Sequence, residues 1–218
     1  MSSKKRILYI SQEVTPFLKA SEISSNVKTL AQKTQESGKE IRVFMPRYGL
    51  VNERRNQLHE VIRLSGMNMI INDVDHPLII KVASIPSAKM QVYFIDNQEF
   101  FKRKAIVKDE KGKYFDDNTQ RSVFFIRGTL ETVKKLGWIP DVIHCHGWLT
   151  ALLPMYLKTY FKDDPHYANT KVISSIYEDS FTGELDKNTL DILKFDGVED
   201  SYFNHFKNDL SYTSLTKT

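Results

Sequence analysis

The sequence predicts an α/β protein of the Rossmann-like, doubly wound class, with a mainly parallel sheet and one antiparallel excursion. Two observations lead to this prediction. Short, dense apolar runs alternate with longer amphipathic segments, as strands and helices do in βαβ units. Between residues 58 and 84, by contrast, shorter apolar runs are separated by turn signals, which is typical of antiparallel strands. We find no internal repeat or low-complexity linker and expect one domain over residues 1–218.

The N-terminal part has the pattern of a βαβ unit. Its expected elements are a buried strand at Lys5–Ser11, a loop at Gln12–Ile23, a helix from Ser24 or Ser25 to Ser37, and a strand at Ile41–Met45. A serine hydroxyl can cap the first turn of this helix, and Gly38 suits the left-handed residue that follows a helix end. A strand, a helix and a strand in this order form a right-handed crossover, which implies a parallel pair.

The rest of the chain supplies the other layers. The expected strands are Leu58–Leu64, Met67–Asn72, Leu78–Ser84, Met90–Asp96, Asp141–Cys145 and Val172–Ile176. The expected helices run from Asp117 or Asn118 to Lys135, over Leu149–Tyr160, and over the shorter segments Thr189–Leu193 and Tyr202–Leu210. Gly137 ends the long helix and Pro140 prevents its continuation, because proline lacks the N–H that a helix needs.

Composition excludes several classes of protein. The 31 basic and 27 acidic side chains leave a net charge of +4, and the basic cluster Lys102–Lys104 is followed by Asp109 and Glu110. This indicates a solvated surface rather than a nucleic-acid site. No apolar run approaches the ~20 residues of a membrane span, and Ile7–Ile10 is too short for a signal peptide. The single cysteine, Cys145, excludes an intrachain disulfide, so we expect a cytoplasmic protein.

Ligands of open parallel sheets bind at the carboxyl ends of the strands. Three segments leave such ends: the loop after Ser11, the segment Pro46–Gly49, and the segment His144–Trp148. The chain has no Walker loop, no G-x-S-x-G, no H-E-x-x-H and no metal-spaced Cys/His cluster. We therefore expect neither a metal ion nor another cofactor.

The same segments carry motifs of a known family. Ser11–Ile23 (SQEVTPFLKASEI) resembles a family stretch Ser-x-Glu-x-x-Pro-Phe-x-Lys-x-Gly-Gly-Leu, and the next three matches are Pro46–Tyr48, Tyr114–Phe125 and Pro140–Thr150. Their order and spacing resemble the N-terminal, starch synthase catalytic domain of the bacterial glycogen/starch synthase family, which are GT-B glycosyltransferases.

The resemblance implies a fold and an activity. Members of this family have two Rossmann-like domains that face a cleft, and they transfer glucose from ADP-glucose to the 4-hydroxyl of an α-1,4-glucan with retention and without a metal. The second domain holds most of the nucleotide, while the first supplies a glycine-rich loop, the acceptor surface and a histidine near the sugar. This chain resembles the first domain only. We expect it to be weak or inactive alone and to act with a missing C-terminal domain or as a homodimer through the exposed interdomain face.

The resemblance also assigns site residues. They are His146 as the tentative catalytic, sugar-contacting histidine, Lys19 and Glu13 in the donor or phosphate loop, and Asn118, Tyr48 and Trp148 in the acceptor or sugar cleft. Structural alternatives remain open: His146 can cap a strand end, Asn118 a helix, and Trp148 can anchor the core. The neighbouring His144 is expected on the opposite face of the strand and is interpreted as structural.

The chain departs from the family pattern at polar positions. Ser21 and Glu22 stand where the family has Gly-Gly, and Gly147 stands where it has Asp. Ser174–Glu178 replaces a Thr-[Ile/Val]-His-Asn stretch. A carboxylate at position 22 would repel a diphosphate at 4 Å by about 4 kcal/mol at an effective dielectric constant of 20. Three hypotheses follow: half of a glucosyltransferase, a non-catalytic module that binds glucan or regulates a partner, or a relic without ligand.

Overall fold

The computed structural model describes residues 4–178, 185, 188–204 and 208–215. Its strands are β1 (Arg6–Ser11), β2 (Glu40–Pro46), β3 (His59–Glu60), β4 (Met67–Ile71), β5 (Val74–Ile85), β6 (Met90–Asp96), β7 (Val142–His146) and β8 (Lys171–Ser175). The strand order is β3-β5-β6-β2-β1-β7-β8, and β4 pairs with β5. The five neighbouring strands β6, β2, β1, β7 and β8 are mutually parallel. The pairs β3–β5, β4–β5 and β5–β6 are antiparallel. The predicted mainly parallel α/β sheet with an antiparallel excursion is confirmed.

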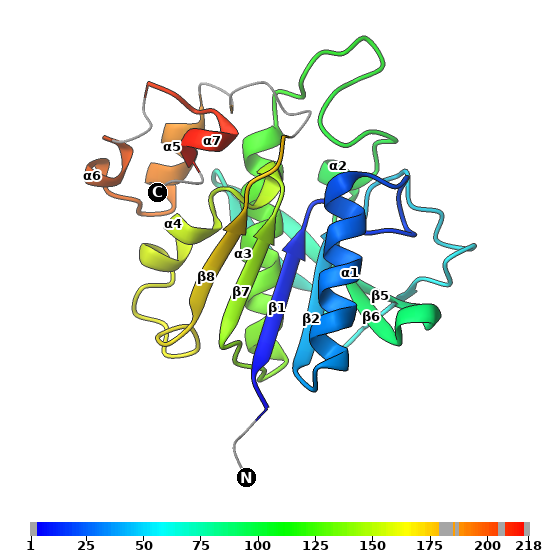
Figure 1. Cartoon of the computed structure of the whole chain (residues 1–218). Coiled ribbons are helices and arrows are strands. Elements are labelled where there is room, and N and C mark those ends of the chain that lie inside the picture. The colour runs from blue at the N-terminus through cyan, green and yellow to red at the C-terminus, as the bar shows by residue number, and fades with distance from the viewer. Residues whose placement is uncertain (1–3, 179–184, 186–187, 205–207, 216–218) are drawn as a thin grey trace.

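Helices cover both faces of this sheet, as Figure 1 shows. They are α1 (Glu22–Glu36), α2 (Gln98–Phe101), α3 (Asn118–Lys135), α4 (Leu153–Lys158), α5 (Thr189–Phe195), α6 (Asp200–Phe203) and α7 (Tyr212–Leu215), with 3-10 turns η1 at Pro86–Ala88 and η2 at Trp148–Thr150. In Figure 1, α1 lies in front of β1 and β2, and α3 lies behind the sheet. Both helices begin at the edge where the parallel strands end, so this edge collects their first turns and the loops before them.

The long helices begin differently from the sequence prediction. The first helix begins earlier than predicted, at Glu22, because Ser21 rather than Ser24 or Ser25 is its N-cap. The Ser21 hydroxyl accepts a hydrogen bond from Ser24 N, and Ser24 Oγ accepts one from Ser21 N. This reciprocal pair satisfies two backbone donors at the start of the helix. The second long helix begins at Asn118, but neither Asp117 nor Asn118 caps it through its side chain, because both side chains bond to other segments.

Other segments also differ from the prediction. The expected strand Leu58–Leu64 is reduced to β3, while β5 extends over the whole of Val74–Ile85. The expected helix Leu149–Tyr160 divides into η2 and α4, and Pro154 lies in the first turn of α4, where its missing N–H has no intrahelical partner to lose. Beyond residue 195, α6 ends at Phe203 instead of Leu210, α7 was not predicted, and residues 205–207 lie outside the described residues.

The core lies on both sides of the parallel strands. Their central residues are fully buried, among them Leu8, Ile10, Phe44, Phe94 and Cys145. Fully burying a side chain of this size contributes about 1.5–3 kcal/mol. The apolar sheet therefore gives a rigid base, and the polar groups at its carboxyl edge rest on it. No helix in the described part of the chain is long and apolar enough to cross a membrane.

Candidate functional site

A hollow of about 660 Å³ lies beside the loop that follows β1. Its wall consists of residues from three loops: Glu13, Pro16, Phe17, Leu18, Lys19, Leu50, Asn52, Arg55, Asn56 and Ile106. The loops after β1 and β2 contribute most of this wall, which places the hollow at the carboxyl edge of the sheet. That edge is where open parallel sheets bind their ligands.

The first loop is anchored by apolar side chains and presents polar ones. Phe17 and Leu18 are buried, and the Phe17 ring packs edge-on against Phe94 with 4.9 Å between ring centroids. Lys19 follows directly and is exposed, and Glu13 is half-buried. The structure thus brings together the two residues that the sequence assigned to this loop, Glu13 and Lys19, on the wall of one hollow.

Neutral donors hold the Glu13 carboxylate from both sides. Gln12 Nε2 donates a hydrogen bond of 2.9 Å to Glu13 Oε1, and Ser21 Oγ donates one of 2.9 Å to Glu13 Oε2. Hydrogen bonds to a charged acceptor are stronger than neutral ones. We call Gln12, Glu13 and Ser21 the Glu13 clamp. The sequence did not indicate the Gln12 contribution, because glutamine in a loop carries no positional signal.

His146 lies at the end of β7 and is fully buried. Its Nδ1 is 2.8 Å from Tyr177 Oη, and no described group partners its Nε2. Burial, with a smaller contribution from the nearby His144, lowers the pKa of His146 to about 3, so the imidazole is neutral. His146 is not part of the hollow's wall. Its assignment as the sugar-contacting residue stays a prediction.

The predicted orientation of His144 is wrong. The His144 and His146 rings are 4.1 Å apart, so both side chains lie on the same face of β7. Side chains two residues apart on a strand share a face, and only immediate neighbours point to opposite faces. Burial lowers the pKa of His144 as well. The pair is therefore a neutral aromatic contact at neutral pH.

The three residues assigned to the acceptor cleft are buried. Tyr48 is fully buried and Trp148 and Asn118 nearly so. Asn118 Nδ2 donates to Val107 O at 3.0 Å, and Asn118 Oδ1 accepts from Arg121 at 2.7 Å. The Tyr48 ring lies 5.9 Å from the Arg121 guanidinium. In this structure these side chains position the loops that form the edge, and their contact with a glucan stays a prediction.

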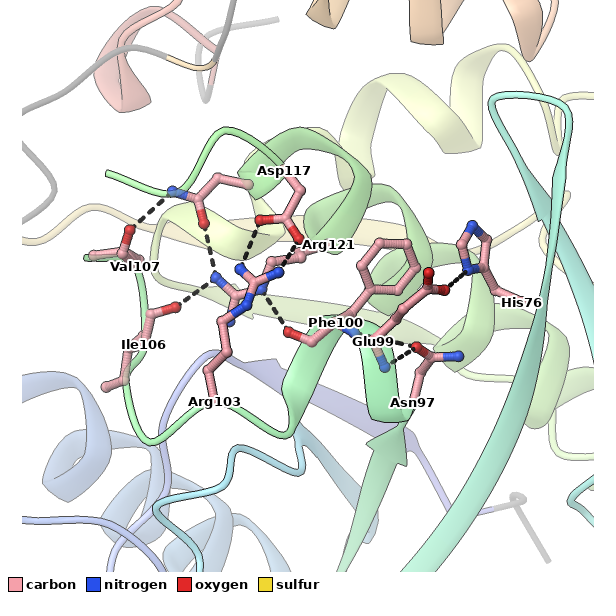
Figure 2. A network of polar contacts seen from close by, with 10 residues as sticks. His76, Asn97, Glu99, Phe100, Arg103, Ile106, Val107, Asp117 and Arg121 are labelled. Atoms are coloured by element: carbon pink, nitrogen blue, oxygen red, sulfur yellow. Dashed lines mark hydrogen bonds and ion pairs between the residues drawn. The ribbon is translucent and has the colours of Figure 1, made fainter. Parts of the chain in front are cut away.

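Arg121 is the centre of a second polar cluster, which Figure 2 shows. Its Nε donates to Phe100 O at 2.8 Å and its Nη1 to Ile106 O at 2.6 Å. We call Arg121, Asn118 and these two carbonyl groups the Arg121 network. Burial lowers the pKa of Arg121. Arg121 lies outside the motifs that predicted the site, although a charged residue on an otherwise apolar helix face is a usable signal.

A second pair near this network is partly exposed. Arg103 Nη1 donates to Asp117 Oδ1 at 2.7 Å, and the guanidinium forms a second bond with Asp117 Oδ2. On the same side, His76 Nδ1 lies 2.7 Å from Glu99 Oε2 (Figure 2). Among the described residues, no group of three or more His, Cys, Asp or Glu side chains is arranged to hold a metal ion.

Comparisons with known proteins test the family. The sequence profile described as the starch synthase catalytic domain matches residues 6–216. The chain belongs to this family. It is 38% identical over 173 residues to a glycogen synthase of Chlorobium limicola and 34% identical over 204 residues to one of Chlorobaculum tepidum. The resemblance drawn from the motifs is confirmed.

The relatives of this starch synthase family member are longer. The matched segments cover 79% and 89% of this chain but only 35% and 42% of the two glycogen synthases. The chain thus spans well under half the length of the curated relatives that it matches. The catalytic domain of starch synthase IV from Arabidopsis thaliana, solved with ADP and acarbose, aligns with a TM-score of 0.66 and 22% identity over 79% of this chain and 34% of that one. This alignment supports the fold.

Proposed function

We propose that this chain is the N-terminal, acceptor-side half of a glycogen/starch synthase-like glucosyltransferase. In this proposal residues 1–218 form one domain, and a second Rossmann-like domain on the same or another polypeptide holds ADP-glucose. The observation that carries the proposal is the hollow with Glu13 and Lys19 on its wall, at the edge where such sheets bind ligands. Glu13 offers a hydrogen-bond acceptor for glucan hydroxyl groups, and Lys19 a positive charge for the donor phosphates.

The half-site supports only weak or no turnover by itself. Transfer needs a bound donor, and the backbone at the start of α1 is poorly suited to hold one. The N–H groups of Ser21 and Ser24 are already bonded to serine side chains, and Glu22 adds a negative charge in the first turn. A phosphate would compete with both features.

A glucosyl-transfer assay with ADP-glucose and glycogen tests the proposal. We expect the purified chain to bind glycogen, to show little or no transfer alone, and to support transfer when the C-terminal domain of a family member is added. Lys19→Ala should reduce transfer in the reconstituted reaction, and Lys33→Ala, at an exposed position of α1, serves as a charge-matched control. Robust transfer by the chain alone, abolished by His146→Ala, would instead show that the half-site is complete.

A second candidate function is a non-catalytic module that binds glucan or regulates a partner. The capped start of α1 favours this module, because a backbone N–H group that could bind phosphate is already bonded to the Ser21 hydroxyl. One double variant tests whether the start of α1 is what excludes the donor. Ser21→Gly with Glu22→Gly should improve ADP-glucose binding if the serine hydroxyl and the carboxylate are what exclude the donor. Unchanged binding in calorimetry would remove that explanation of weak activity.

Glycogen co-sedimentation separates the module from a relic without ligand. The half-enzyme and the glucan-binding form of the module both require retention on glycogen or on malto-oligosaccharide at millimolar concentration, whereas a module that regulates a partner does not. Light scattering tests the homodimer that an exposed interdomain face would allow, and a monomer at high protein concentration counts against it.

A further inference from the structure

We propose that Gln12 and Ser21 are positioning residues that fix the Glu13 carboxylate as a sugar-hydroxyl acceptor, and that glycine at position 147 makes this arrangement possible. The ligand class rests on the proposed function. The arrangement itself rests on contacts of the described residues. Both bonds of the clamp come from uncharged side chains, so they engage two of the carboxylate's lone pairs without bringing a positive charge to it. A carboxylate has about four acceptor positions, which leaves two for a ligand.

Gln12 is held in one place by its surroundings. Its backbone N–H donates to His146 O at 3.1 Å, which continues the register of β1 and β7 beyond the paired residues Ser11 and His146. Only 2% of the residue is exposed. Because Gln12 is fixed, its hydrogen bond also restricts the Glu13 side chain. A side chain that is already ordered loses little entropy when a ligand binds.

Gly147 provides the space for this side chain. Its φ of 87° lies in the left-handed region, and a Cβ built on it would lie 2.3 Å from Gln12 Cδ and Oε1. All three of the closest atoms belong to the Gln12 side chain. A larger residue at position 147 and the present Gln12 position are therefore mutually exclusive. The family's Asp at this position would also bring a second carboxylate toward Glu13, with like-charge repulsion.

Two departures from the family pattern thus act on one group. Ser21, where the family has Gly, contributes one of the bonds to Glu13, and Gly147, where the family has Asp, makes room for the other. A site that had only decayed would not be expected to keep a carboxylate ordered between two donors at 2.9 Å. Both departures therefore support the observed position of the Glu13 carboxylate.

The ligand-dependent test is calorimetric titration with maltoheptaose. We expect Gln12→Ala to weaken binding by about tenfold, since a bond to a charged group is lost. Gly147→Ala should weaken binding similarly by displacing Gln12, and the double variant should bind no more weakly than Gln12→Ala alone. Gln32→Ala is the matched control: it removes a half-buried glutamine of α1 that bonds to Glu36 and does not contact the clamp, and it should bind like the wild type. Wild-type affinity in Gln12→Ala would overturn the proposal.

The ligand-free test is nuclear magnetic resonance of the Gln12 side-chain amide. Its two N–H signals should show slowed hydrogen exchange in the wild type and lose that protection in Glu13→Ala and in Gly147→Ala. Unaltered exchange in Glu13→Ala would overturn the clamp, whatever the chain binds. If the amide responds but the wild type does not bind maltoheptaose, the clamp stands and the glucan ligand is wrong. Because Gly147→Ala adds backbone strain, Gln12→Ala and Glu13→Ala carry the test if that variant does not fold.

Discussion

The Glu13 clamp and the Arg121 network lie at the same edge of the sheet, yet they are built in opposite ways. Arg121 is fully buried and donates mainly to backbone carbonyl groups, those of Phe100 and Ile106, so its bonds fix the course of the chain between α2 and α3. Glu13 is half-buried, receives its bonds from side chains, and borders a hollow. The difference shows that a buried charge bonded to the backbone organises a fold, whereas a charge fixed by side chains at a surface is available to a ligand.

The largest expected effect comes from breaking the Arg121 network. Arg121→Met should reduce the free energy of unfolding by about 3 kcal/mol, because two buried carbonyl groups and the Asn118 amide lose their donor. Urea unfolding measures the loss. The control is Arg103→Met, which breaks a partly exposed ion pair and should cost about 1 kcal/mol or less. Equal losses in the two variants would contradict the distinction between the buried network and the surface pair.

The next effect concerns pH. The pKa of His146 is about 3 in the folded chain, well below the ~6.5 of an unfolded histidine. Between these values the unfolded chain binds a proton that the folded chain does not, so acidification favours unfolding. His146 alone should reduce stability by about 2 kcal/mol between pH 7 and pH 5.

Urea unfolding of His146→Gln at several pH values measures the contribution of His146 to the loss of stability at low pH. The variant should lose less stability than the wild type when the pH falls from 7 to 5. Tyr177→Phe keeps the half-buried ring at position 177 and removes only the hydroxyl that contacts His146, so it should keep most of the pH dependence. An identical pH dependence in His146→Gln and the wild type would show that His146 is accessible to protons in the folded state. In that case His146 would belong with the ligand-facing groups.

The smallest effect concerns the start of α1. Both Ser21→Ala and Ser21→Gly lose the bond to Glu13, but Ser21→Ala should cost about 1 kcal/mol through the lost N-cap and Ser21→Gly only a few tenths, because glycine is a better N-cap than alanine. Thermal unfolding of the two variants compares capping with backbone freedom. Greater stability of Ser21→Ala than of Ser21→Gly would mean that capping is not the role of Ser21 in the fold.

Part of the site was predictable because it depends on local sequence. The loop containing Glu13 and Lys19 follows an apolar strand, and the carboxyl end of a parallel strand determines which edge that loop joins. The clamp was not predictable in the same way. Gln12 and Ser21 meet Glu13 only after the loop has turned back onto α1, and the space that Gly147 leaves for Gln12 depends on the pairing of β1 with β7.

The sequence by itself determined the α/β class, the family and the edge that carries the site, because apolar periodicity and ordered motifs are properties of neighbouring residues. Only the tertiary structure decided which polar residues are exposed. Tyr48, Asn118 and His146 are polar in the sequence and buried in the fold, because long-range packing of α2, α3 and the strands encloses them. The burial of a side chain depends on contacts with segments that are distant in the sequence, so the pattern of neighbouring residues does not predict it.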